Sequence, residues 1–354
     1  MKKLLSLDGG GIRGLMTALI LQEIEKTLPN PKGRDLGETN LLRDHFDLVA
    51  GTSTGSILAA AIAIGKPLQA VIDLYETRGE NIFPPVMERW SSRMLRSFSQ
   101  GLSHPKYRDR PLGEELKAVL CHADGTPLTL GEVAYPLLIQ AFDATRHEPV
   151  VFKSKPKSAP EKEDHDLPLW EVVKASCSAP TFFPAHGLRY RDFPKKHALI
   201  DGGVFANNPT LIAIAEVLAH GNDADLLCIS LGTSEEDVPG LSLKNGREMG
   251  AMEWALPLIG IFMGGGSRHV HSLAKRIVTK GNTRSDRYLR FQMMTAKDIP
   301  MDEAGPKDIR RMRAVVAEYL GGHPDDEKMR NLHRQRGFDY AGNLKKLRKH
   351  FSEG

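Results

Sequence analysis

The sequence has few cysteines and no long apolar run. Its 354 residues include 3 cysteines, none in a Cys-x-x-Cys pair, which argues against a disulfide framework or a cysteine-rich metal site. We therefore expect a reducing compartment and a cytoplasmic protein. No apolar run approaches the ~20 residues that a membrane span needs. The apolar start of the chain breaks at Asp8, too early for a signal-peptide core. Any contact with a membrane is then expected at its surface.

The sequence also lacks a large excess of positive or negative charge. Lys and Arg number 48 and Asp and Glu number 44, which gives a net charge of +4. A charge this small does not favour a nucleic acid polymer as partner, although a mildly basic surface suits an anionic membrane face or ligand. Apolar residues make up 41% of the chain and charged residues 26%, as is typical of a globular protein with a large core.

Short apolar runs alternate with helical patterns along the chain. Strands are expected at 3–7, 46–50, 136–143, 150–153, 198–200 and 226–231, and helices at 14–28, 53–64, 169–176 and from 209 onward. This alternation predicts an α/β fold with a mostly parallel sheet. No repeat or domain-sized linker interrupts it. We therefore expect residues 1–354 to form a single domain, with a motif-bearing part at about 1–240 and a helical part at about 241–354.

A Gly-x-Ser-x-Gly motif follows the second expected strand. Residues 51–55 read GTSTG and lead into an apolar helical run. In this context the glycines permit a sharp turn that lifts the serine hydroxyl above the sheet, and the N-terminus of the helix favours a developing negative charge. Ser53 is therefore the candidate nucleophile, with a small-residue turn that merely packs as the alternative.

A glycine-rich loop joins the first expected strand to the first helix. Residues 8–14 read DGGGIRG. Glycines let consecutive backbone amides converge on one anion, so Gly9, Gly10 and Gly11 are candidates for an oxyanion hole. Arg13 either meets a substrate phosphate or braces the loop.

The same loop leaves two other function classes open. It fits the dinucleotide pattern Gly-x-Gly-x-x-Gly at 9–14, which makes a nucleotide-binding oxidoreductase an alternative. That pattern calls for an acidic residue at the end of the second strand, where this chain has the serine motif instead. A weakly active storage or binding protein is the third class, and the intact motifs argue against it.

An Asp-Gly-Gly motif follows the short apolar run at 198–200. Asp201 is placed to face a site at a strand end, although Asp-Gly-Gly is also common turn chemistry. The later histidines occupy no obvious strand-end loop. A Ser–Asp dyad, in which Asp201 takes the proton of Ser53 directly, therefore needs fewer assumptions than a triad. No cluster with metal-ligand spacing is visible, and we expect neither a metal nor a cofactor.

These three motifs, in this order, resemble the patatin-like phospholipase family. Further similar segments are residues 75–84, 174–185 and 201–209, and the resemblance covers about residues 3–235. It implies a three-layer α/β/α fold and metal-independent, phospholipase A-type hydrolysis of membrane lipid esters. It also implies that Ser53 and Asp201 form the dyad. The chain departs from the family at Ser56, where many members have glycine.

The resemblance also implies partners. Bacterial members of this length include anti-phage effectors that cyclic oligonucleotides activate and that degrade the host membrane. We expect a membrane phospholipid as substrate, met peripherally at the inner membrane face. A cyclic oligonucleotide activator and a homo-oligomer stay open. No motif indicates a nucleotide site, and the unmatched C-terminal part, with Arg268, Lys275, Arg276 and Arg284, is where one would be sought.

Access to lipid requires a surface that touches the bilayer, and residues 85–101 are the candidate. Read as a helix, they carry an apolar stripe and a basic stripe, formed by Trp90, Met94 and Phe98 and by Arg89, Arg93 and Arg96. This arrangement suits an interfacial helix on anionic lipid. The alternative is an amphipathic helix whose apolar stripe packs on the core.

Overall fold

The fold is known from a computed structural model. It describes residues 1–30, 33, 41–85, 104–154, 164–191, 193–219, 225–236, 247, 249–280, 286–297, 299–323 and 325–352. The candidate bilayer-contacting segment at 85–101 therefore lies, after Pro85, outside the described residues.

An eight-stranded sheet forms the centre of the described part, in the order β5-β6-β3-β2-β1-β7-β9, with β4 paired to β3. Its strands are β1 (Lys2–Leu7), β2 (Leu48–Thr52), β3 (Leu137–Asp143), β4 (Glu148–Lys153), β5 (His186–Leu188), β6 (His197–Asp201), β7 (Leu226–Leu231) and β9 (Tyr288–Phe291). A separate two-stranded sheet pairs β8 (Glu235–Glu236) with β10 (Met294–Thr295).

Helices cover both faces of this sheet. They are α1 (Gly14–Glu25), α2 (Leu42–His45), α3 (Thr54–Ala63), α4 (Leu68–Ile82), α7 (Asp109–Leu120), α8 (Leu169–Cys177), α9 (Gly203–Ala206), α10 (Thr210–Ala219), α12 (Ala251–Thr279), α13 (Pro306–Leu320), α14 (Glu327–Arg336) and α15 (Tyr340–Ser352). Single turns of 3₁₀ helix lie at Gly11–Arg13 and Leu130–Glu132.

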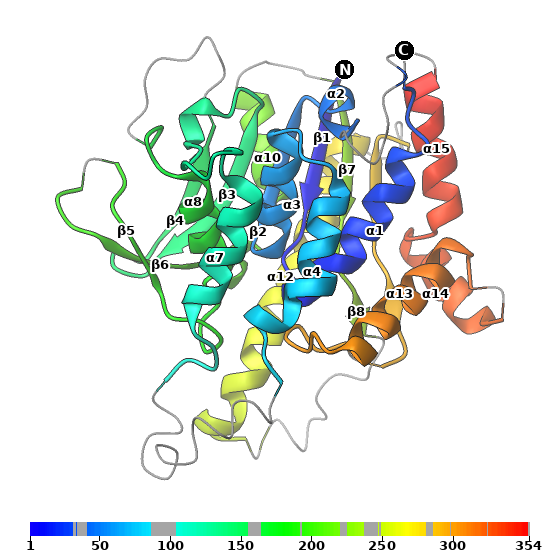
Figure 1. Ribbon diagram of the computed structural model, residues 1–354. Helices are drawn as coiled ribbons and strands as arrows, with labels where there is room; N and C mark the ends of the chain where they lie inside the picture. The colour runs from blue at the N-terminus through cyan, green and yellow to red at the C-terminus, as the bar shows by residue number, and fades with distance from the viewer. Residues whose placement is uncertain are drawn as a thin grey trace.

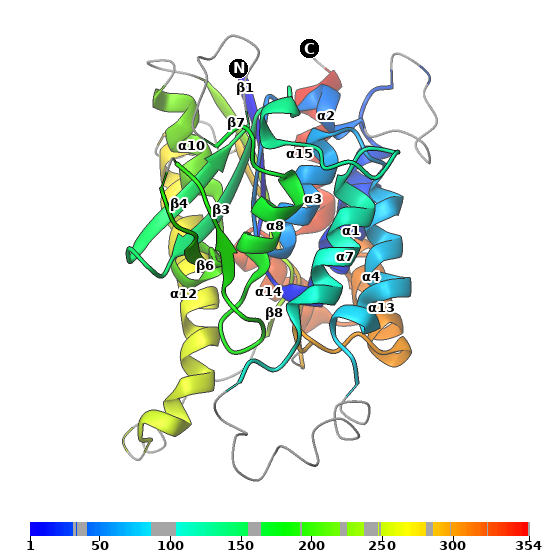
Figure 2. The ribbon, with the colours of Figure 1, turned by 60° about the vertical axis from the view of Figure 1, so that its left-hand side comes forward.

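The alternation of side chains along β1 separates two apolar cores. Leu5 and Leu7 are buried in the larger core, with residues of α1, α3, α4, α7 and α8. Leu4 points to the opposite face and joins a smaller core with residues of α10 and α12. Figures 1 and 2 show the sheet between these two groups of helices. The predicted three-layer α/β/α fold is confirmed.

The central strands run parallel. Strand β1 pairs in parallel with β2 and β7, β2 with β3, and β7 with β9. Only the side of the sheet beyond β2 is mixed, because β4 and β6 run antiparallel to β3. The carboxyl ends of β1, β2, β3 and β7 therefore meet at one edge, where ligands of open α/β sheets bind.

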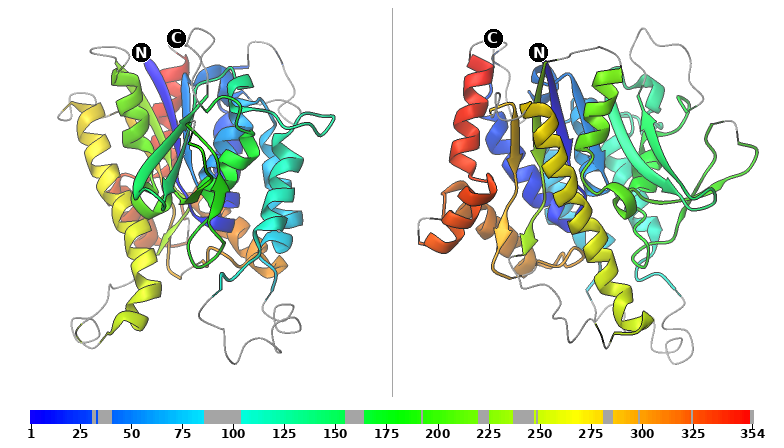
Figure 3. Two further views of the ribbon diagram at one scale, coloured as in Figure 1. Left: turned by 90° about the vertical axis from the view of Figure 1, so that its left-hand side faces the viewer. Right: turned by 180° about the vertical axis from the view of Figure 1, so that it is seen from behind.

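The C-terminal third of the chain adds to the same sheet. Strand β9 extends it beyond β7, α13 packs against α1, and α15 packs against β9, as the rear view in Figure 3 shows. No sequence motif indicated these contacts. Our expectation of a single domain over residues 1–354 stays a prediction.

A buried ion pair joins this C-terminal third to the glycine loop. Arg290, on β9, donates from Nη1 to Oδ1 of Asp8 at 2.9 Å and from Nη2 to Oδ2 at 2.6 Å. Each side chain is 3% exposed. Ser267 of α12 donates to the same carboxylate at 2.8 Å, and Ser230 and Gln292 accept from the guanidinium, each at 2.7 Å. Both charges are thus surrounded by hydrogen-bonding partners.

Breaking this pair from one side should destabilise the fold. Arg290→Met leaves the Asp8 carboxylate buried without its partner, which typically costs about 3–5 kcal/mol. Adding Asp8→Asn removes the unpaired buried charge, so the double variant should recover much of the lost free energy of unfolding. Urea unfolding of both proteins measures this. Lys26→Met, which removes an exposed pair with Glu23, is the control and should barely move the midpoint. Equal midpoints for Arg290→Met and the wild type would show that the pair is not needed.

Candidate active site

The serine motif forms a sharp turn between β2 and α3. Ser53 has φ 52° and ψ −127°, a conformation that a residue with a side chain rarely adopts. The flanking glycines are required by close contacts. A Cβ on Gly51 would lie 2.4 Å from the carbonyl oxygen of Gly55, and one on Gly55 would lie 2.1 Å from that of Leu7. The sequence prediction of a strand, a turn and a helix here is confirmed to within two residues at each boundary.

Two neighbouring serines hold this turn. The amide of Ser53 donates to Oγ of Ser176 at 2.8 Å, and that hydroxyl donates to the carbonyl of Gln140 on β3 at 2.6 Å. The hydroxyl of Ser56 donates to the carbonyl of Ser53 at 2.6 Å. A residue with positive φ costs about 1–3 kcal/mol and persists only where its surroundings fix it. Sequence reasoning missed Ser176, which lies in α8, and noted Ser56 only as a departure from the family.

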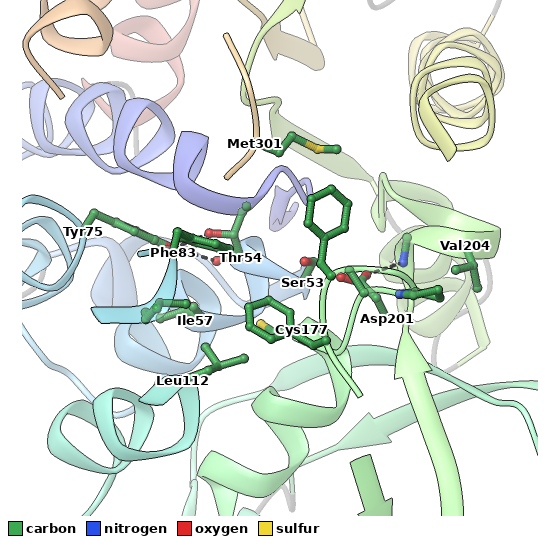
Figure 4. Close-up of a pocket in the computed structure, with 17 residues that line it drawn as sticks. Ser53, Thr54, Ile57, Tyr75, Phe83, Leu112, Cys177, Asp201, Val204 and Met301 are labelled. Atoms are coloured by element: carbon green, nitrogen blue, oxygen red, sulfur yellow. Dashed lines mark hydrogen bonds between the residues drawn. The ribbon is translucent and has the colours of Figure 1, made fainter. Parts of the chain in front are cut away.

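The register of the sheet brings Asp201 level with Ser53. Thr52 pairs with Gln140, and the next residue of β3, Ala141, pairs with Asp201 on its other side. Ser53 follows Thr52, so the two candidate residues occupy equivalent heights on either side of β3. Figure 4 shows the Ser53 hydroxyl beside the Asp201 carboxylate.

The Asp201 carboxylate is deeply buried, with 2% of the residue exposed. Burial raises its pKa from 3.8 to about 6, and the Ser53 hydroxyl and the Gly203 amide act in the opposite direction. The Gly203 amide donates to Oδ1 at 2.7 Å. Within the described residues Oδ2 has no hydrogen-bond partner, and the Ser53 hydroxyl lies beside the carboxylate. A carboxylate with a raised pKa and a free oxygen is suited to accept a proton near neutral pH.

The glycine loop lies against this turn. The amide of Gly9 donates to the carbonyl of Asn207 at 3.1 Å, so it is already engaged. The amides of Gly10 and Gly11 donate to no other described residue. Gly11 has φ 60°, and the carbonyl of Met301 packs where its Cβ would be. Of the three amides predicted for the oxyanion hole, the geometry therefore leaves two available, those of Gly10 and Gly11.

Arg13 is bonded to the loop itself. Its Nε donates to the carbonyl of Gly10 at 3.2 Å, and its amide donates to the same oxygen at 3.3 Å. In a trans peptide the N–H points opposite to the C=O. Holding the Gly10 carbonyl on one side therefore turns the Gly11 amide to the other. This contact favours loop bracing over the alternative role at a substrate phosphate.

An apolar pocket adjoins the two candidate residues. It has an empty volume of about 950 Å³, which includes the open solvent at its mouth. Ser53, Asp201 and Gly11 border it, and its apolar lining includes Ile57, Tyr75, Ile82, Phe83, Leu112 and Phe183. Figure 4 shows Tyr75, Ile57 and Leu112 on the far side of Ser53 from Val204. The shape and lining suit a hydrocarbon chain that reaches Ser53.

Three features of the lining bear on the chemistry. Cys177 borders the pocket, but burial and then the nearby Asp201 raise the pKa of its thiol, so it stays protonated and does not compete as a nucleophile. None of the described lining residues is a histidine, which agrees with a dyad. Met301, from the C-terminal third, also lines the pocket, and sequence reasoning missed it.

The raised pKa of Asp201 predicts a pH-dependent stability. A group whose pKa is raised by folding stabilises the fold fully below its ordinary pKa of 3.8, and this contribution is lost as pH rises through about 6. At pH 8 the buried charge is unfavourable, so Asp201→Asn should be more stable than the wild type by about 3 kcal/mol. Towards pH 5 the difference should shrink. Urea unfolding at both pH values measures it, and a variant equally destabilised at both would contradict the assignment.

The chain is similar to several known proteins. The profile of the family described as patatin-like phospholipase matches residues 5–214. Patatin-like protein 2 of Arabidopsis thaliana is 36% identical over 60% of this chain and 52% of its own length. A cGAMP-activated phospholipase of Escherichia coli is 31% identical over 66% of this chain and 63% of its own length. The chain thus spans between half and two thirds of these two relatives.

Two other matches cover a larger share of this chain. Patatin-like protein 1 of Arabidopsis thaliana is 30% identical over 90% of this chain and 81% of its own length. The crystal structure of VipD from Legionella pneumophila aligns with 97% of this chain and 74% of its own, at 15% identity and a TM-score of 0.38. The family profile covers more than half of the chain and includes the glycine loop, the serine turn and Asp201. The chain therefore belongs to the patatin-like phospholipase family of serine hydrolases.

Proposed function

We propose that the protein is a lipid acyl hydrolase that cleaves ester bonds of membrane phospholipids with a Ser53–Asp201 dyad. The observation that supports this most is the position of Asp201. Its free carboxylate oxygen faces the Ser53 hydroxyl at the border of an apolar pocket. Burial raises the pKa of this carboxyl group to about 6, which suits a base working near neutral pH.

The proposed reaction has two half-reactions. Ser53 Oγ attacks the ester carbonyl carbon while its proton passes to Oδ2 of Asp201, and the carbonyl oxygen becomes an oxyanion. As the tetrahedral intermediate collapses, the bond to the leaving oxygen breaks and Asp201 returns the proton to that oxygen. Water then attacks the acyl-serine with Asp201 as base, which releases the fatty acid and restores Ser53.

The oxyanion is proposed to bind the amides of Gly10 and Gly11. A donor already aimed at the developing charge is worth about 3–4 kcal/mol. Gly9 would serve differently. A Cβ at this position would lie 3.0 Å from Cβ of Ser53, so glycine allows the loop to approach the nucleophile.

The two alternative functions fit less well. A dinucleotide at the glycine loop would need open space at the N-terminus of α1. Met301 already packs against Gly11, and the Ser53 turn packs against Gly9. For a storage or binding protein, the buried charge at Asp201 and the positive φ of Ser53 would be unfavourable features without a use.

Removing the nucleophile tests the proposal directly. Ser53→Ala should lower the hydrolysis of both a soluble short-chain ester and phospholipid by at least about 10⁴-fold, with an unchanged melting temperature. In the wild type, kcat/KM should fall below about pH 6, tenfold per pH unit, as Asp201 becomes protonated. Addition of EDTA is the control and should change nothing. Turnover of Ser53→Ala within tenfold of the wild type would exclude this residue as nucleophile.

Arg13 supplies a second test. If it braces the Gly10 carbonyl, Arg13→Ala should lower kcat by about 10- to 100-fold on phospholipid and on a short neutral ester alike, because both reactions use the same oxyanion hole. Arg13→Lys, which keeps the charge but not the Nε contact, should be nearly as impaired. A loss confined to phospholipid would assign Arg13 to the substrate phosphate instead.

Control of the enzyme by a cyclic oligonucleotide, and with it a part in anti-phage defence, is a second proposal. It rests on the Escherichia coli relative, which is named as cGAMP-activated. Of the basic residues considered for such a site, Arg268 forms an ion pair with Glu235 at 3.1 Å, and Lys275 and Arg276 are exposed. Lipid hydrolysis with and without added cGAMP tests the proposal.

A further inference from the structure

The N-terminal half of α12 extends beyond the rest of the described body. Within this helix, Ser267 donates to Asp8 at the carboxyl end of β1, which places Ser267 level with the edge of the sheet that holds the pocket. The helix begins sixteen residues earlier, at Ala251, or about 24 Å along its axis at 1.5 Å per residue. Figures 1 and 3 show this half, in yellow, running past the strand ends and past α4 and α7.

The sequence of this half is apolar. Residues 251–263 read AMEWALPLIGIFM and carry one charge, at Glu253. From 254 to 285 the chain has no Asp or Glu but five Lys or Arg. A helix that is apolar on all sides normally lies inside a protein or in lipid.

Part of this helix lies open to solvent. Ile261 is 47% exposed, and a Cβ built on Gly265 or Gly266 would meet no described atom within 4 Å. Ile261 is thus an apolar side chain that is open to something outside the described chain.

We propose that residues 251–263, the docking half-helix, bind the protein to an anionic lipid surface. The proposal rests on the proposed function, because the bilayer that supplies the acyl chain must approach the edge of the sheet where Ser53 and Asp201 lie. The docking half-helix projects from that same edge. An apolar helix can enter the boundary between head groups and acyl chains by about 5–10 Å, and the lack of acidic residues after Glu253 avoids repulsion by anionic head groups.

The contacts of α12 fix how docking would orient the site. The helix packs against α9, whose first residue, Gly203, donates the backbone hydrogen bond to Asp201. Further contact comes through Ser267, which is bonded to Asp8 at the start of the glycine loop. The helix is therefore attached to both sides of the site, so a bilayer bound at its end has a defined position relative to the pocket.

Two isoleucines on one helix provide a matched test. Ile261 is 47% exposed and Ile277 is 45% exposed, and they lie about 24 Å apart along α12. Ile261→Asp should weaken binding of the full chain to phosphatidylglycerol-containing vesicles by at least about tenfold. Ile277→Asp should bind like the wild type. Vesicles of non-hydrolysable ether lipids, sedimented with the protein, separate binding from catalysis.

The outcomes distinguish the docking proposal from the proposed function. Both variants should hydrolyse a soluble short-chain ester at the wild-type rate, since neither residue lines the pocket. Absent vesicle binding by the wild type, or equal losses for Ile261→Asp and Ile277→Asp, would overturn the docking proposal even where ester hydrolysis depends on Ser53. If Ile261→Asp instead converts an oligomer to a monomer and leaves vesicle binding intact, the half-helix is an interface between copies and the lipid proposal is wrong.

Discussion

The ion pair between Asp8 and Arg290 is the interaction on which the frame of the site depends. Asp8 opens the glycine loop, and Arg290 lies 282 residues later on β9. Ser267, Ser230 and Gln292 complete the hydrogen bonds around the two charges. A buried charge pair of this kind tolerates little displacement, because a misplaced charge is left without a partner. The C-terminal third, which carries no family motif, is thereby connected to the candidate active site.

The site combines two unfavourable features that the surrounding fold offsets. The backbone of Ser53 has a strained conformation, which the hydroxyls of Ser176 and Ser56 hold in place. The carboxylate of Asp201 is buried with one oxygen unpaired. Each feature costs stability, and each has a use in the proposed chemistry, since the first presents the hydroxyl and the second makes a better base. Strain of this kind is characteristic of functional sites.

The parts of the site that could be predicted from the sequence are those that depend on contiguous residues. Ser53 and Asp201 each sit in a short glycine motif after a strand, and the structure brings them together as expected. Arg290, Ser176 and Met301 were not predicted, because they reach the site from distant segments through hydrogen bonds and packing that leave no local pattern. The engaged amide of Gly9 was missed for a similar reason, since its acceptor is the carbonyl of Asn207, and a backbone oxygen has no sequence signature. For Arg13 the sequence left two roles open, at a substrate phosphate or as a brace of the glycine loop. Only its contact with the Gly10 carbonyl distinguishes them.

Strand β3 determines how far apart the candidate dyad lies, although none of its side chains belongs to the dyad. Ser53 and Asp201 are 148 residues apart in the chain, and they meet because Gln140 pairs with Thr52 while Ala141 pairs with Asp201. One residue added to β3 between Gln140 and Ala141 would shift Asp201 relative to Ser53 by about 3.3 Å along the strand. This is farther than a proton transfer can span. Substitutions in β3 that preserve its volume leave this spacing intact, but insertions and deletions do not. Over evolutionary time, a constraint on length rather than on residue identity should therefore apply to this strand.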